Sequence, residues 1–268
     1  MKKLLLILLC LPFMTFGQMT YVPDDNFEQE LINLGYDNII DDYVLTSNIN
    51  LLDSLNVSDL NISDLTGIED FTNLEYLDCG FNQLTSLDVS QSPALTSLNC
   101  STNVITSLNL SQCPALEYLE CGVNQLTSLD LSQSSSLSSL SCVGNQLTNL
   151  DVSQNTSLTQ LYCAMNQLTS LDVRNGNNTN LTDFWSGNNP NLSCINVDDI
   201  AWATTNWTSI DPQHYFSNNC SGTTIQEHSI NKEILKVTDL LGRETKQTNQ
   251  PLLYLYDDGT VEKKIIIK

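Results

Sequence analysis

The chain has very few basic residues before its C-terminal tail. Between Gln18 and Cys220 a single base, Arg174, stands against 24 aspartates and glutamates, and the whole chain has a formal net charge of −21. Such a surface would repel a phosphate backbone, which argues against nucleic-acid binding. The acidity is more simply interpreted as a contribution to solubility. Histidine is also scarce, because only His214 and His228 occur.

Long hydrophobic runs are missing except at the start of the chain. Two lysines precede an apolar run from Leu4 to Phe13, and small residues follow before Gln18. This pattern predicts a secretory signal peptide over residues 1–17. Lipidation at Cys10 is the alternative, but the leucines before it are poor neighbours for that modification. With no other segment apolar enough to cross a bilayer, we expect a secreted or surface-attached protein without a transmembrane segment.

What the chain does have is a block of 21 residues that recurs in register. The pattern L-x-x-L-x-C-x-x-N-x-(L/I) opens at Leu74, Leu95, Leu116, Leu137 and Leu158, and a divergent copy begins 23 residues later at Leu181. A fixed period of this length predicts a solenoid, in which each unit buries its apolar face against its neighbours.

Each repeat contains two similar halves, each ending in an alternating apolar pattern that is typical of a strand. The sequence therefore predicts two short strands per coil, pairing in parallel with the next coil at about 4.8 Å. No stretch from Leu74 to Val173 has the period of a helix.

These repeats resemble the leucine-rich repeat family, specifically its nested bacterial class of 21 residues. The resemblance covers residues 45–197, including a 22-residue unit from Leu52 that is similar to the internalin-type variant, with Leu60 in place of the asparagine. It implies a β-rich solenoid with a surface for a partner and without a reaction centre or cofactor.

Two polar ladders follow from the phase of the repeat. Asn82, Asn103, Asn124, Asn145 and Asn166 are expected to turn inward and bind backbone groups, a structural role. Asp88, Asn109, Asp130, Asp151 and Asp172 precede a turn, where such side chains bind nearby amides. Calcium binding by these acids is the second interpretation, but the spacing D-x-D-x-D-G is absent.

The cysteines fall into two groups. Cys79, Cys100, Cys121, Cys142 and Cys163 share the inward phase, where parallel side chains about 4.8 Å apart suit neither disulfides nor a metal site. We expect buried free thiols and no metal. Cys194 and Cys220 bracket the end of the solenoid and are candidates for a disulfide in an exported protein. Cys113 has no obvious partner.

Both ends of a solenoid need covers. Residues 18–44 are expected to form an N-terminal cap with a short helix that opens within Pro23–Glu28, is capped by Asp24 or Asp25 and runs to Leu34 before Gly35. Residues 198–220 are expected to form an irregular, aromatic covering loop, with a binding loop as the alternative.

The segment 221–268 has a balanced charge and reads as a separate module. Strand-like residues 234–243, 252–256 and 261–267 include a hairpin around Asp257-Asp258-Gly259-Thr260. From about residue 230 the segment resembles the type A C-terminal sorting domain of the type IX secretion system of Bacteroidota. That resemblance implies outer-membrane passage through this machinery, followed by surface attachment or release. A marginal β unit is the purely structural interpretation.

The repeat phase also indicates which side chains of the first strand face outward. The candidate binding residues are Tyr76, Asp78, Tyr118, Glu120, Tyr162 and Trp185. Aromatic and acidic side chains in this arrangement suit a protein or glycan ligand. Ordinary decoration of a sheet is the equally weighted alternative. Rows of threonine and serine on the other side (Thr85, Thr106, Thr127, Thr148 and Thr169; Ser86, Ser107, Ser128 and Ser170) are expected to be plain solvated surface.

The leading hypothesis is therefore a non-catalytic binding or adhesion module. A hydrolase is the alternative from another class, with His214 beside Cys220 as its weak thiol–histidine candidate. A purely structural envelope component is the third possibility.

Overall fold

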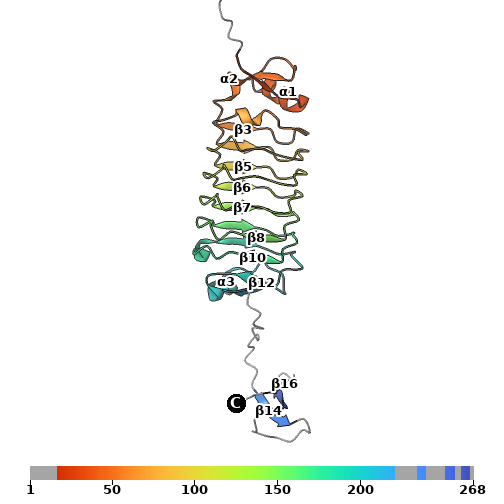
Figure 1. The fold of residues 1–268 in the computed structure, drawn as a ribbon, viewed down its shortest axis with the longest axis vertical. Coiled ribbons are helices and arrows are strands. Elements are labelled where there is room, and N and C mark those ends of the chain that lie inside the picture. Colours follow the sequence, from red (N-terminus) through yellow and green to blue (C-terminus); the bar gives the residue numbers. More distant parts are fainter. Residues whose placement is uncertain (1–16, 221–233, 240–250, 257–260, 266–268) are drawn as a thin grey trace, which may run out of the picture. The chain divides into compact units, whose positions relative to one another are not determined.

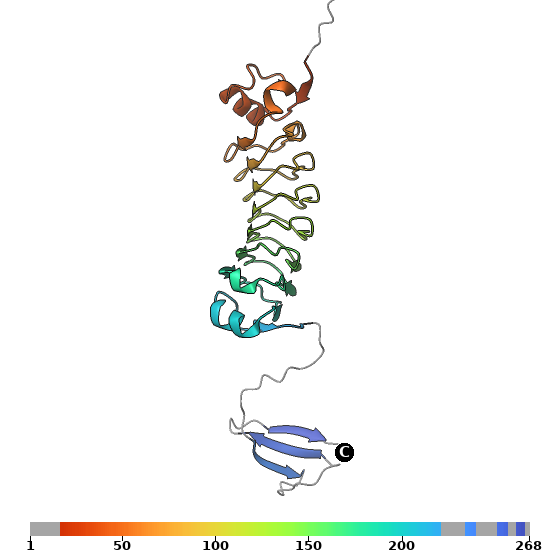
Figure 2. The same cartoon turned by 90° about the vertical axis from the view of Figure 1, so that its left-hand side faces the viewer.

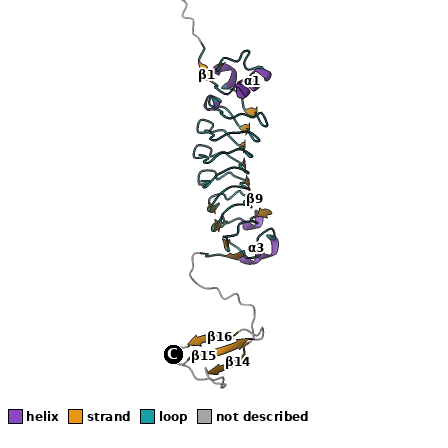
Figure 3. Cartoon of the chain, turned by 90° about the vertical axis from the view of Figure 1, so that its right-hand side faces the viewer, coloured by secondary structure: helices purple, strands orange, loops and turns teal. Residues whose placement is uncertain are grey.

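A computed structural model of the protein describes residues 17–220, 234–239, 251–256 and 261–265. The chain divides into two compact units, Met1–Cys220 and Ser221–Lys268. The first is a stack of short turns in which each strand lies above the next, as Figure 1 shows. Side views of this stack appear in Figure 2 and Figure 3.

A seven-stranded parallel sheet runs along one side of the stack. Its strands, in spatial order, are β3 (Ser54–Asn56), β4 (Tyr76–Asp78), β5 (Ser97–Asn99), β6 (Tyr118–Glu120), β7 (Ser139–Ser141), β9 (Gln160–Tyr162) and β11 (Asp183–Trp185). The middle residue of each strand points inward, and Leu77 pairs with Leu98, which pairs in turn with Leu119. This register places the first and third residues of every strand on the outer face.

The second half-repeats form a smaller sheet. It contains β8 (Asn149–Asp151), β10 (Ser170–Asp172), β12 (Cys194–Asn196) and β13 (Tyr215–Ser217). In earlier coils the equivalent segments bury their leucines without a strand ladder, and neighbouring coils are joined by bonds such as Gln125 N–H to the Ile105 carbonyl at 2.9 Å. The second strand of each coil is thus present only toward the C-terminal end of the solenoid.

The two sides enclose one continuous apolar core. Leu77, Leu98, Leu119, Leu140 and Leu161 are each 0% exposed. Residues 74–173 contain no helix, whereas single 3₁₀ turns lie before and after them at Ile68–Asp70 and Asn178–Asn180. The result is a leucine-rich repeat solenoid in which each coil buries its leucines only against its neighbours.

The five ladder asparagines are buried beside the first sheet and bind backbone groups. The Asn124 side chain donates to the carbonyls of Cys100 and Cys121 at 3.0 and 3.2 Å and accepts from Ile105 N–H at 3.0 Å. Each member therefore links its own coil to the preceding one. Asn189 continues the ladder, because it accepts from Leu168 N–H and donates to the Cys163 carbonyl.

The five cysteines at the inward phase are buried free thiols. Burial raises the pKa of Cys100 and Cys142 to about 12, and it raises the pKa of the other three thiols well above the ordinary value. Cys113 is also a buried free thiol, in a turn on the other side of the coil, with its sulfur 3.8 Å from the Val89 carbonyl. These cysteines contribute apolar volume to the core.

The N-terminal cap combines a helix and a two-stranded ribbon. Helix α1 (Asp25–Asn33) is capped by Asp24, and β1 (Met19–Tyr21) pairs antiparallel with β2 (Tyr43–Leu45), which leads into α2 (Thr46–Ile49). The Asp24 carboxylate also accepts from the backbone N–H groups of Ser63 and Asp64 at 2.8 and 3.1 Å. One side chain thus begins the helix and ties it to the first coil.

The C-terminal cover is more regular than the sequence suggested. Residues 198–220, expected as an irregular loop, contain helix α3 (Ile200–Asn206), capped by Asp199, and strand β13, which extends the second sheet beside β12. Trp207 is 2% exposed and stacks on Phe184 with ring centroids 4.4 Å apart. The segment lacks a regular apolar pattern, which predicts a loop, but Trp207 fills the open end of the core.

A disulfide joins Cys194 and Cys220 across this cover. Asp211 holds the last coil, because its carboxylate accepts from Asn188 and Asn189 N–H at 2.8 Å each. Partial burial raises the pKa of Asp211, but these hydrogen bonds and the nearby His214 outweigh it, so the pKa lies below its ordinary value. The end of the solenoid is therefore closed by covalent, apolar and polar contacts together.

The second unit is a three-stranded antiparallel sheet. Strand β15 (Pro251–Tyr256) lies between β14 (Ile234–Asp239) and β16 (Val261–Ile265), as drawn in blue in Figure 2. The predicted hairpin of β15 and β16 is present, whereas its connecting residues 257–260 lie outside the described part of the chain.

We predict that Asn124→Ala lowers the free energy of unfolding by about 3 kcal/mol, because it leaves several buried backbone groups without partners. The matched control is Asn109→Ala, which removes an exposed side chain that bonds only Ser111 N–H and should cost less than about 1 kcal/mol. Urea unfolding of both variants measures the difference. Equal midpoints would contradict a structural role for the ladder.

Candidate functional site

The outer face of the seven-stranded sheet brings the six candidate binding residues onto one surface. Tyr76 and Tyr118, at the first position of β4 and β6, are 38% and 39% exposed. Asp78, Glu120, Tyr162 and Trp185 occupy the third position of their strands and are partly exposed. Because the sheet is in register, these two positions form adjacent rows along the stack.

Each of the first two tyrosines engages the acid of its own strand. The Tyr118 hydroxyl donates to Glu120 at 2.6 Å, and the Tyr76 hydroxyl donates to Asp78 at 3.4 Å. Partial burial, this hydrogen bond and the negative charge of Glu120 raise the pKa of Tyr118 to about 12. Partial burial, the negative charge of Asp78 and the hydrogen bond to it likewise raise the pKa of Tyr76. Both phenols are therefore held neutral beside carboxylates.

The C-terminal end of this face is less acidic. Tyr162 on β9 pairs with Trp185 on β11 in the third-position row. In the neighbouring row, Gln160 accepts from the Ser139 hydroxyl at 2.9 Å and donates to Asp183 at 3.4 Å. The face thus changes from tyrosine–acid pairs over β4 and β6 to aromatic side chains with an amide network over β9 and β11.

The threonine row lies in solvent, and the row of acids before the turns has a structural role. Thr85, Thr106, Thr127, Thr148 and Thr169 are exposed. The acids before the turns accept from the N–H group two residues on, as Asp130 does from Ser132 at 2.9 Å. Within the described residues no group of three or more acids, histidines or cysteines could hold a metal ion.

The thiol–histidine pair considered for a hydrolase is not formed. The Cys220 sulfur belongs to the disulfide, and the His214 ring is buried in the C-terminal cover. Its Nδ1 accepts from Asp211 N–H at 3.2 Å. His228 lies outside the described residues. His214 is thus part of the cover, where it contacts the carboxylate that holds the last coil.

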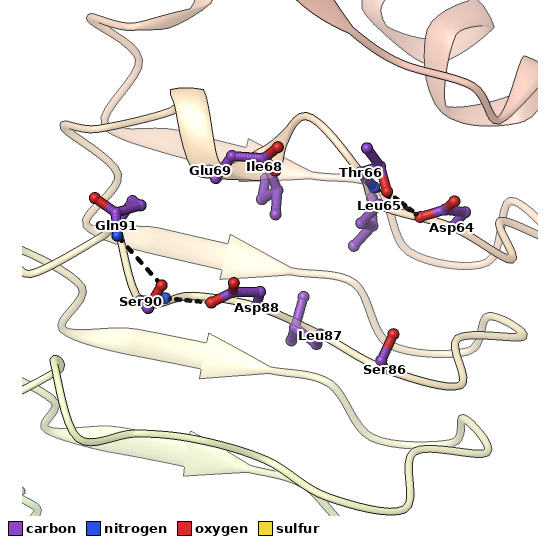
Figure 4. Close-up of a pocket in the computed structure, with 10 residues that line it drawn as sticks. All are labelled: Asp64, Leu65, Thr66, Ile68, Glu69, Ser86, Leu87, Asp88, Ser90 and Gln91. Atoms are coloured by element: carbon purple, nitrogen blue, oxygen red, sulfur yellow. Dashed lines mark hydrogen bonds between the residues drawn. The ribbon is translucent and has the colours of Figure 1, made fainter.

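The sequence pattern did not indicate a hollow of about 370 Å³ between the second halves of two successive coils. Figure 4 shows its lining, which includes Asp64, Glu69 and Asp88. Their carboxylates accept from the N–H groups of Thr66, Gly67 and Ser90 at 2.8, 2.8 and 2.9 Å. These acids therefore stabilise turns and do not converge on a ligand.

The sequence reasoning also missed an exposed row beside the candidate face. Phe81, Val123 and Met165 are 59%, 57% and 49% exposed, and all three have positive φ angles between 53° and 57°. Their constant spacing of 42 residues was visible in the sequence. Their conformation was not, because bulky side chains rarely adopt left-handed backbone angles.

Comparisons with known proteins agree with this architecture. The family model described as the Endo-beta-N-acetylglucosaminidase EndoS LRR domain matches residues 45–155. Internalin J of Listeria monocytogenes serotype 4b (strain F2365) is 41% identical over 72 residues, which are 27% of this chain and 8% of internalin J.

Two solved structures from Listeria monocytogenes are similar in fold. The functional domain of InlJ, described as including a cysteine ladder, has a TM-score of 0.59 at 36% identity. The match covers 68% of this chain and 43% of the InlJ chain. An internalin (inlF) of strain 4b F2365 has a TM-score of 0.54 at 25% identity, with coverages of 73% and 56%. The chain spans only part of each relative. No helix among the described residues is long and apolar enough to cross a membrane.

We predict that Tyr118 ionises near pH 12 and that Glu120→Gln lowers its pKa, because the charge that disfavours tyrosinate is removed. The folded-state pKa lies above the unfolded value of about 10, so the stabilising contribution is complete below about pH 10 and is lost as the pH rises through the folded-state pKa. Tyrosinate absorbance of each protein, with Tyr118→Phe subtracted as the control, measures this step. Ionisation of Tyr118 near pH 10 in the unmodified protein would contradict the assignment.

Proposed function

We propose that this leucine-rich repeat protein is a non-catalytic binding module that recognises a protein ligand at the cell exterior through the outer face of the seven-stranded sheet. The observation that carries the proposal is the in-register display of Tyr76, Tyr118, Tyr162 and Trp185 on one unpartnered sheet. Partly exposed aromatic side chains on a rigid support offer contact area at a low entropic cost. The likeness to internalins over part of their length supports a role in surface recognition or adhesion.

We further propose that the protein leaves the cell through type IX secretion, with residues 221–268 as the linker and sorting domain. The three-stranded antiparallel sheet of β14, β15 and β16 supports a compact C-terminal signal. Its separation from the solenoid as a unit fits a tail that is removed during surface attachment or release. The leader at residues 1–17 would direct the first membrane passage.

The binding role predicts that replacing Tyr76, Tyr118, Tyr162 and Trp185 together by alanine weakens binding to cells and to arrays of secreted proteins by about tenfold or more in affinity. The matched control replaces Thr85, Thr106, Thr127 and Thr169 by alanine on the other side of the coil. Urea unfolding verifies that both variants are folded. Undiminished binding by a folded aromatic variant would contradict recognition through this face, whereas an unmodified chain that binds neither cells nor secreted proteins would favour a structural envelope role. A glycan array run in parallel identifies a carbohydrate ligand.

The export role predicts that a reporter fused to residues 221–268 behind a signal peptide reaches the cell surface or the medium of a bacterium with a type IX system. In a mutant that lacks this system the same fusion should remain in the periplasm. A reporter without the tail is the control. Periplasmic retention of the tailed reporter in the intact strain would refute the sorting function.

A further inference from the structure

From β4 to β7, the outward side chains of the seven-stranded sheet alternate with a period of two coils. Each of these strands, taken with the residue before it, reads in turn Glu-Tyr-Leu-Asp at 75–78, Thr-Ser-Leu-Asn at 96–99, Glu-Tyr-Leu-Glu at 117–120 and Ser-Ser-Leu-Ser at 138–141. We call 75–78 and 117–120 the two acidic rungs. Between them, β5 carries only small polar side chains.

Each acidic rung is a unit of one tyrosine and two carboxylates. Glu75 and Glu117 are exposed at the start of the rungs, and the tyrosine hydroxyl bonds the acid at the end. Because β5 pairs with both β4 and β6, the rungs are two strand spacings apart, which is about 10 Å. The face therefore presents two similar sites, separated by the shorter side chains of β5.

The exposed row beside the sheet extends the same two rungs. Phe81 follows the first and Val123 the second, each with a positive φ that Thr102 and Met165 share at the same phase of the repeat. Gly144 shows the residue that this backbone favours at the same phase. A bulky or β-branched residue there costs on the order of 1–2 kcal/mol, while the exposed side chain adds little to the core. These side chains instead give each rung an apolar end.

A carboxylate pair around a tyrosine ring suits a cationic side chain, through charge-assisted hydrogen bonds and cation–π contact. The solenoid supplies no such cation to this face. Arg174 is the only base in residues 18–220, and it forms an ion pair with Asp172 on β10 of the other sheet. A cation for this face must therefore come from outside residues 18–220, and a basic segment of a partner would supply it.

The distance between the rungs distinguishes a polyproline II partner from a β-strand partner. In a polyproline II segment, residues three apart lie on the same side and about 9 Å from each other. Residues that share a face of a β-strand lie about 7 or 13 Å apart. We propose that the two acidic rungs dock an extended, polyproline II-type protein segment that carries a lysine or arginine at every third position. This inference rests on the proposed function, since it names the chemistry of its partner.

The test uses the full purified chain and synthetic proline-rich peptides with two arginines placed two, three or four positions apart. Fluorescence anisotropy should show that the three-position peptide binds about tenfold more tightly than the others. The variant Glu117→Gln/Glu120→Gln should lose about tenfold in affinity for it. The matched control, Asp130→Asn/Asp151→Asn, removes two exposed acids elsewhere on the solenoid and keeps their hydrogen-bond acceptors; it should bind as the unmodified chain does.

Equal affinity for all spacings, or no effect of the glutamate variant, would overturn the inference. A preference for a helical peptide with arginines seven positions apart would overturn it as well. If a protein partner still requires Tyr76 and Tyr118 but ignores the glutamate variant, the binding role stands and the cationic segment is wrong. If the alanine variant and the glutamate variant are both without effect, both proposals fail.

Discussion

The solenoid depends on satisfying the backbone groups of a tight bend without water. Each coil turns just after its first strand, and the buried asparagine at the turn takes up an N–H of the preceding coil and carbonyls of both coils. An unpaired buried amide is expensive, so this one side chain allows the chain to turn inside a dry interior. The asparagine bonds make the tight bend stable, and burial of the leucines adds further stability to the coil. The strands of neighbouring coils pair in register along the whole stack.

That register is what creates a candidate site. Short strands of three residues leave only two outward positions per coil. Each coil therefore contributes one pair of side chains to the outer face of the sheet. Parallel pairing in strict register aligns these pairs into rows, and the tyrosines of β4 and β6 each stand beside the acid of the same strand. A rigid support with freely variable outward positions suits recognition, because side chains there can change without disturbing the core.

Acidic side chains and exposed apolar side chains lie together at one part of the outer face. Residues 18–220 carry a single base, and that base is paired on the second sheet. The exposed Phe81 and Val123 occupy a backbone conformation that disfavours them. Many of the acids hold turns and caps, but Glu75 and Glu117 are exposed at the two rungs, and Phe81 and Val123 lie beside the same two rungs. Exposed apolar side chains in an unfavourable backbone conformation, beside a cluster of charge, are expected where a surface contacts a partner.

The repeat period by itself determined the solenoid, the inward leucines and thiols, and the outward rows, because a fixed phase leaves each position only one environment. Tertiary structure decided the rest. Asn189 joins the ladder although two inserted residues break the period, since the last coil still needs its bend satisfied. Residues 198–220 form a helix and a strand, because Trp207 and Phe216 must cover an open core. The left-handed backbone of Phe81 and Val123 was invisible in the sequence, as it is imposed by the neighbouring coil through hydrogen bonds such as Val123 N–H to the Val143 carbonyl at 2.7 Å.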